Sequence, residues 1–150
     1  MTIGPDDVRK AKTVLRQHRR ETKAARPKPE KGRVRNSAYL NWLHRDLECV
    51  ACVIEQYPTW PERYPIEAAH QKNLDGKGAT LGRRVDDRFS CSLCAWHHRL
   101  GPLRCDPAQR KFWSAIGVSA KDFCAALFEA FENKKPGADV VRRFAGEARR

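Results

Sequence analysis

Two clusters of cysteine and histidine, far apart in the sequence, constrain the fold of this chain more than any other feature. They read Cys49-Val-Ala-Cys52 and Cys91-Ser-Leu-Cys94-Ala-Trp-His97-His98. A C-x-x-C turn directs two sulfurs at one point, and Zn2+ prefers four soft ligands at tetrahedral corners. We expect one structural zinc ion that ties the clusters together through Cys49, Cys52, Cys94 and His97. The alternative second pair of ligands is Cys91 with Cys94.

The remaining sequence favours metal ligands over disulfides. The chain starts Met-Thr-Ile-Gly-Pro-Asp-Asp, without the basic and apolar regions of a signal peptide. We therefore expect a cytoplasmic protein, in which thiols stay reduced. Of the six cysteines, Cys124 lies among apolar residues and is predicted to belong to the core, whereas the neighbours of Cys105 assign it no role.

An excess of positive charge indicates an anionic partner. The 30 lysines and arginines outnumber the 18 acidic residues, and the net charge is +12. Nucleic acid is the usual partner of such a chain, and no apolar run is long enough to span a membrane. The charge is densest in residues 1–35, which we predict to be a basic helical arm followed by a Pro/Lys linker. This arm would contact phosphates without reading sequence; the alternative is a solvated tail.

Local patterns predict an α+β domain over residues 36–135, followed by a basic C-terminal tail over residues 136–150. Asn36 or Ser37 is a suitable cap for an amphipathic first helix, and Ser119 begins a capping box. Gly117 is the expected end of the helix before that box. The predicted elements are helix 36–47, a turn at 49–52, strands 66–71 and 86–91, and helices 94–99, 106–116 and 119–135.

Two histidines are not needed by the zinc ion. His70 ends a predicted strand and precedes a basic segment rich in glycine. His98 follows His97 directly, and on a helix its side chain points about 100° away from that ligand. Histidines beside a basic groove suggest phosphodiester hydrolysis, with one acting as general base and the other holding a divalent ion. The alternative is a purely structural role for both.

The order of C-x-x-C, Glu67-Ala-Ala-His70 and Leu93-Cys-x-x-His-His98 resembles the HNH endonuclease superfamily. It is most similar to phage-encoded, zinc-containing relatives of the recombination-enhancement nuclease Ref, and the resemblance covers about residues 38–131. It implies a zinc-stabilised ββα-metal (HNH, or His-Me finger) core flanked by α-helices. In that core His70 would activate water and His98 would bind Mg2+ or another divalent ion.

The chain also departs from the family pattern. Ala69 stands where many members carry a metal-binding Asp or His, and strand alternation places the nearest carboxylate, Glu67, on the opposite face from His70. The central asparagine of the family has no match, and Asp86, Asp87 or Ser90 could stand in for it. The alternative metal ligands are therefore Cys91, Glu67, Asp86 and Cys105.

The resemblance and the charge together predict a metal-dependent DNA endonuclease. It would act in phage or prophage DNA recombination or processing, on duplex or single-stranded DNA, with recombinase-coated DNA as a further implied substrate. The candidate phosphate contacts are Arg83, Arg84, Arg88, Arg99, Arg19 and Arg20. One alternative is a non-catalytic zinc protein that binds nucleic acid; another is an RNA-binding zinc protein or a phage assembly factor.

Overall fold

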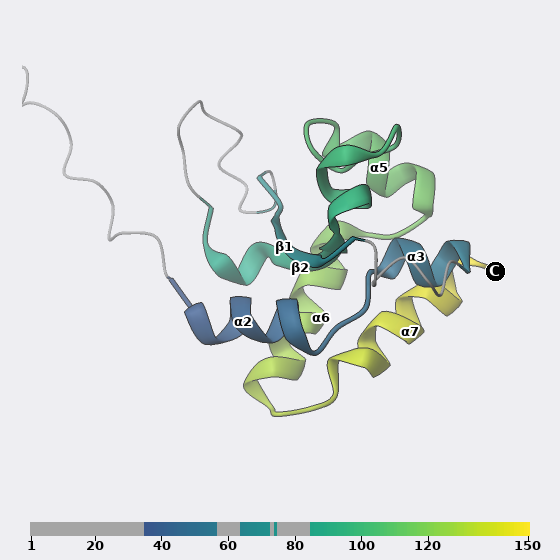
Figure 1. Cartoon of the computed structure of the whole chain (residues 1–150). Coiled ribbons are helices and arrows are strands. Elements are labelled where there is room, and N and C mark those ends of the chain that lie inside the picture. The colour runs from purple at the N-terminus through teal and green to yellow at the C-terminus, as the bar shows by residue number, and fades with distance from the viewer. Residues whose placement is uncertain (1–34, 57–63, 73, 75–84) are drawn as a thin grey trace, which may run out of the picture. The chain divides into compact units, whose positions relative to one another are not determined.

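The computed structural model describes residues 35–56, 64–72, 74 and 85–150 (Figure 1). This part of the chain has an α+β fold in which helices surround a small two-stranded sheet. The expected basic arm lies outside the described residues, as do four expected phosphate contacts: Arg19, Arg20, Arg83 and Arg84. Among the described helices, none combines the length and the apolar character needed to cross a membrane.

The first described helix, α2 (Ser37–Arg45), begins where the sequence predicts. The Asn36 side chain accepts a hydrogen bond from the Tyr39 amide at 2.9 Å, which satisfies one of the free amides at the helix start. Tyr39 and Leu43 are fully buried. The Tyr39 hydroxyl donates to the Ser90 carbonyl at 2.9 Å, so α2 is tied to the sheet.

A short helix replaces the turn expected at the first cysteine pair. Helix α3 (Val50–Glu55) has Cys49 at its N-terminal cap and Cys52 in its first turn. Val50 and Ala51 are fully buried, and α3 packs against the C-terminal helix α7 (Gly137–Ala148). Burial of these apolar side chains favours the helix, which still brings both sulfurs to one side.

The sheet is an antiparallel hairpin of β1 (Ile66–His70) and β2 (Ser90–Cys94). Its register pairs Ile66 with Cys94 and His70 with Ser90. The second strand starts later than predicted because the 3-10 helix η1 (Asp87–Phe89) precedes it. A one-turn π-helix, η2 (Trp96–Leu100), follows β2. In Figure 1 the hairpin lies between η2 and α5 (Gln109–Ile116) on one side and α2 and α6 (Ala120–Glu132) on the other.

The ends of α5 and α6 follow local signals, with one exception. Gly117 adopts a φ of 68° at the end of α5, as predicted. The Ser119 side chain accepts from the Asp122 amide at 3.4 Å at the start of α6. Helix α5, however, begins at Gln109 and not at Asp106, because the Asp106 carboxylate contacts side chains elsewhere instead of capping the helix.

The C-terminal segment, expected to be a basic tail outside the domain, forms a helix that is part of it. Val141 and Ala145 on α7 are fully buried, and α7 packs against α3 and α6. These residues are four positions apart and therefore lie on one face of the helix. The expected domain boundary at residue 135 is thus too early.

Candidate metal centres

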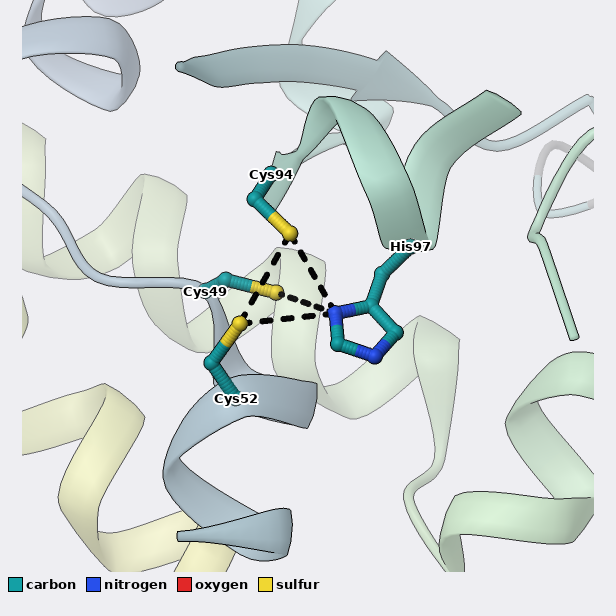
Figure 2. A group of neighbouring side chains, drawn as sticks. All are labelled: Cys49, Cys52, Cys94 and His97. Atoms are coloured by element: carbon teal, nitrogen blue, oxygen red, sulfur yellow. Dashed lines mark hydrogen bonds between the residues drawn. The ribbon is translucent and has the colours of Figure 1, made fainter. Parts of the chain in front are cut away.

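The described residues contain one group of three or more cysteine, histidine or acidic side chains that could hold a metal ion, formed by the four predicted zinc ligands (Figure 2). Cys49 and Cys52 come from the start of α3, Cys94 ends β2, and His97 lies in η2. All four are buried, and their ligand atoms lie within 4.8 Å of one another. The hairpin, the π-helix and α3 therefore converge on one point.

The spacing of the ligand atoms matches a tetrahedral ion. The Nδ1 atom of His97 lies 3.5 Å from the sulfur of Cys49, 3.4 Å from that of Cys52 and 3.3 Å from that of Cys94. The sulfurs of Cys52 and Cys94 are 3.6 Å apart. Tetrahedral zinc ligands at about 2.0–2.3 Å from the ion lie about 3.6–3.8 Å from one another. The buried Cys3His cluster can hold a metal ion such as zinc.

Neighbouring groups prepare this cluster for a cation. The Nε2 atom of His97 donates to the Glu55 carboxylate at 3.1 Å, which directs Nδ1 toward the sulfurs. Hydrogen bonds with Cys49 and Cys52 hold the pKa of the Cys94 thiol well below its usual value, whereas hydrogen bonds with Cys49 and Cys94 raise the pKa of the Cys52 thiol. A low pKa favours the thiolate, which is the form that binds metal.

Cys91 and Cys105 belong to a different buried group. Cys91 pairs with Ala69 across the hairpin and faces away from Cys94, because side chains alternate along a strand. The Gln71 amide nitrogen donates to the sulfurs of Cys91 and Cys105, at 3.6 Å in each case, and its oxygen accepts from the Trp113 indole at 2.7 Å. Neither cysteine reaches the cluster of Figure 2, so the alternative zinc pair Cys91 with Cys94 is wrong. Cys124 is buried in the core, as predicted.

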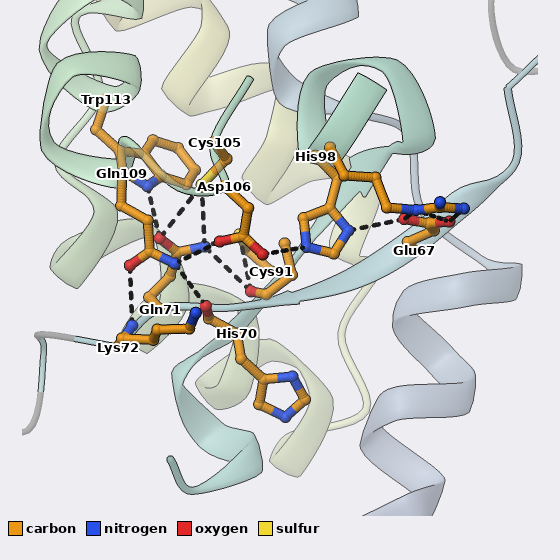
Figure 3. Close-up of polar contacts among 12 residues, drawn as sticks. Glu67, His70, Gln71, Lys72, Cys91, His98, Cys105, Asp106, Gln109 and Trp113 are labelled. Carbon is orange, nitrogen blue, oxygen red and sulfur yellow. Dashed lines mark hydrogen bonds and ion pairs between the residues drawn. The ribbon is translucent and has the colours of Figure 1, made fainter. Parts of the chain in front are cut away.

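His98 lies between two carboxylates (Figure 3). Its Nδ1 atom donates to Glu67 at 2.7 Å, and its Nε2 atom faces the Asp106 carboxylate at 3.5 Å. The Arg99 guanidinium in turn grips both oxygens of Glu67, with a shortest distance of 2.7 Å. Hydrogen bonds from Arg99 lower the pKa of Glu67 in spite of its partial burial. Glu67 is therefore an anion whose position beside His98 is fixed.

His70 is not part of this group. Glu67 faces His98, and His70, three residues further along the same strand, points to the other face of the hairpin (Figure 3). Its Nε2 atom contacts the Asp87 carboxylate at 3.0 Å, and Asp87 also accepts from the Asn36 amide at 2.8 Å. The expectation that His70 and His98 face a common cleft is wrong.

The structure separates the two aspartates that could replace the family asparagine. Asp87 is only 2% exposed and touches His70. Asp86 instead lies 3.8 Å from Arg88, which is 56% exposed and stacks over Phe89. Asp87, not Asp86, therefore occupies the position beside the expected general base.

Asp106 is the residue that sequence reasoning missed. The sequence predicts that Asp106 begins the helix 106–116, but the segment after η2 folds back so that the Asp106 amide donates to the His98 carbonyl at 2.9 Å. One carboxylate oxygen then faces His98 and the other accepts from Gln109 at 3.2 Å. No local signal in the sequence predicts this return of the chain.

Comparisons with known proteins leave the family open. No protein-family model, curated protein or solved structure matches this chain. The resemblance to HNH endonucleases therefore rests on the order and spacing of the cysteine, glutamate and histidine residues alone.

Proposed function

We propose that this protein is a metal-dependent DNA endonuclease of HNH type, in which a zinc-bound scaffold presents a second divalent ion on His98 and Asp106. The observation that carries the proposal is the arrangement of His98, whose Nδ1 atom is held by Glu67 while its Nε2 atom faces Asp106. By resemblance, the enzyme would act in phage or prophage DNA recombination or processing.

The geometry of His98 is that of a metal ligand. A histidine that binds metal through one ring nitrogen usually donates the other N–H to a carboxylate, which fixes its orientation. Glu67 is the carboxylate that accepts this N–H, and Arg99 in turn holds Glu67 in place. Adjacent ligands of an octahedral ion lie about 3 Å apart, and the Nε2 to Asp106 distance is 3.5 Å. Two protein ligands leave positions for water and for a substrate phosphate.

The hydrolysis joins a water oxygen to phosphorus and breaks the bond between phosphorus and one ester oxygen, which leaves as a hydroxyl. An ion at this site would stabilise charge on the phosphate and lower the pKa of a water molecule. His98 and Asp106 would hold it at the surface, since they are 16% and 37% exposed. The water must lose one proton, and the ion would ease this loss by lowering the pKa of the water; His70, paired with Asp87 on the other face of the hairpin, does not face an ion held by His98.

Nicking of a supercoiled plasmid in the presence of Mg2+ or Mn2+ tests the proposal. We expect His98→Ala and Asp106→Asn to lower the rate by about a hundredfold or more. The matched control is Asp139→Asn, which removes an exposed carboxylate on α7, and bound zinc is measured in every variant. The proposal fails if the wild type nicks with no divalent ion, or if Asp106→Asn nicks as fast as the wild type.

His70→Ala tests the base separately. A loss of nicking with unchanged DNA affinity supports a catalytic role for His70. Nicking by His70→Ala at the wild-type rate would mean that the ion and its ligands activate the water.

The second candidate function is a non-catalytic zinc protein that binds nucleic acid. It is favoured by the placement of His70 and His98 on opposite faces of the hairpin. This candidate predicts binding of DNA without nicking by the wild type under any divalent ion.

A further inference from the structure

A basic cavity opens beside the first turns of α5. Its volume is about 620 Å3. Lys72, which follows β1, contributes one wall, and the segment from Pro107 to Lys111 contributes the other, together with Ser114. The expected nuclease residues include none of these side chains.

The described charges around the cavity are positive. Lys72, Arg110 and Lys111 are exposed, and the described residues that line the cavity include no carboxylate. Within the described part of the chain, none of these three cations forms an ion pair. Ser114 adds a hydroxyl that can donate a hydrogen bond. Three cations with no ion-pair partner among the described residues, around one hollow, suit a ligand with several anionic oxygens.

Gln109 connects this cavity to the proposed metal site (Figure 3). Its side-chain nitrogen donates to the His70 carbonyl at 2.8 Å and to the Asp106 carboxylate at 3.2 Å. Its side-chain oxygen accepts from the Lys72 amide at 2.9 Å. One side chain therefore joins the end of β1, a wall of the cavity and the carboxylate that faces His98.

We propose that this cavity binds a backbone phosphate of DNA next to the phosphate that is cleaved at Asp106 and His98. The position of this phosphate beside the cleaved one rests on the proposed function. Binding of a phosphate in the cavity does not depend on cleavage. Phosphate contacts of this kind position the strand and carry no sequence information. Gln109 acts as a positioning residue that keeps the two phosphate positions in register.

The test compares two variants with the same loss of charge. The cavity variant is Lys72→Gln, Arg110→Gln, Lys111→Gln. The control variant is Lys121→Gln, Lys134→Gln, Lys135→Gln, whose lysines are exposed and lie on α6 or in the connection to α7. That connection lies at the opposite end of the domain from α5 (Figure 1). Binding of a short fluorescein-labelled DNA duplex is measured by anisotropy over a range of salt concentrations, without added divalent ion.

We expect the cavity variant to bind on the order of tenfold more weakly than the control. We also expect the slope of log K against log salt concentration to be less steep for the cavity variant. The slope should change by about 0.9 for each phosphate that the variant no longer neutralises. Equal affinities of the two variants would overturn the proposal. A weaker cavity variant in a protein that never nicks DNA would keep the binding site and reject the endonuclease.

A second measurement uses the wild-type protein. Adding the duplex, or inorganic phosphate in a separate titration, is expected to shift the backbone amide NMR signals of Gln109, Arg110 and Lys111. Signals that move with DNA but not with phosphate assign the site to the polymer, and signals that move with both assign it to phosphate groups in general. Signals that move with neither overturn the proposal.

Discussion

Two adjacent histidines would serve two different ions in this protein. On a helix, neighbouring side chains diverge by about 100°, so His97 turns toward the three sulfurs while His98 turns toward Asp106. Each ring donates its other N–H to a glutamate, His97 to Glu55 and His98 to Glu67. The zinc cluster thus fixes the backbone from which the proposed catalytic ligand extends.

The role of Glu67 can be tested through metal affinity. In Glu67→Gln the side chain keeps a hydrogen-bond acceptor for His98 but loses the negative charge and the paired grip of Arg99. We expect Mn2+ affinity and nicking to fall by about 10- to 100-fold with zinc content unchanged. Titration with Mn2+, followed by electron paramagnetic resonance, measures the Mn2+ affinity. The exposed Glu132→Gln on α6 is the control, and equal Mn2+ affinity in the two variants would contradict the assignment.

The ends of helices that depend on contacts within a few residues could be predicted from the sequence, whereas features that depend on tertiary contacts could not. The Asn36 and Ser119 caps and the glycine at 117 act within a few residues, so the sequence reveals them. Helix α7 depends on burial of Val141 and Ala145 against other helices. The placement of Asp106 depends on the return of a loop to His98. The four residues of the Cys3His cluster could be predicted because the ligand spacing that a zinc ion requires is visible in the sequence.

The docking of α7 predicts different effects for its two glycines. A Cβ atom on Gly137 would clash with Leu47 and lie 2.6 Å from the Trp42 ring, whereas one on Gly146 would meet nothing within 4 Å. We expect Gly137→Ala to lower the free energy of unfolding by about 1–3 kcal/mol through overpacking. Gly146→Ala should raise it by up to about 1 kcal/mol through helix propensity. Urea unfolding measures both, and equal effects would show that α7 does not pack as described.

For the whole molecule, the Cys3His cluster links α3 to the end of the hairpin and to η2. Its ligands come from α3, β2 and η2, and α3 packs on α7. A structural zinc site is seldom formed in the unfolded chain, so binding of the ion stabilises the fold directly. Removal of zinc is therefore expected to loosen residues 49–98 as a unit.

Cys52→Ser and treatment with a zinc chelator test this role. Both are expected to remove zinc and to accelerate amide hydrogen exchange in α3, the hairpin and η2 together. Cys124→Ala, at a buried cysteine outside the cluster, should keep the zinc and confine any change to the core around α6. Unchanged exchange after loss of zinc would mean that the fold does not depend on the ion.

The central claim is that one chain holds two ions of different kinds, side by side but on separate ligands. Anomalous X-ray diffraction from crystals grown with Mn2+, recorded at the zinc and manganese edges, measures this directly. We predict a zinc peak among Cys49, Cys52, Cys94 and His97 and a separate manganese peak between His98 and Asp106. A zinc peak with no manganese at His98 would reject the proposed catalytic centre, and the absence of both would reject the scaffold as well.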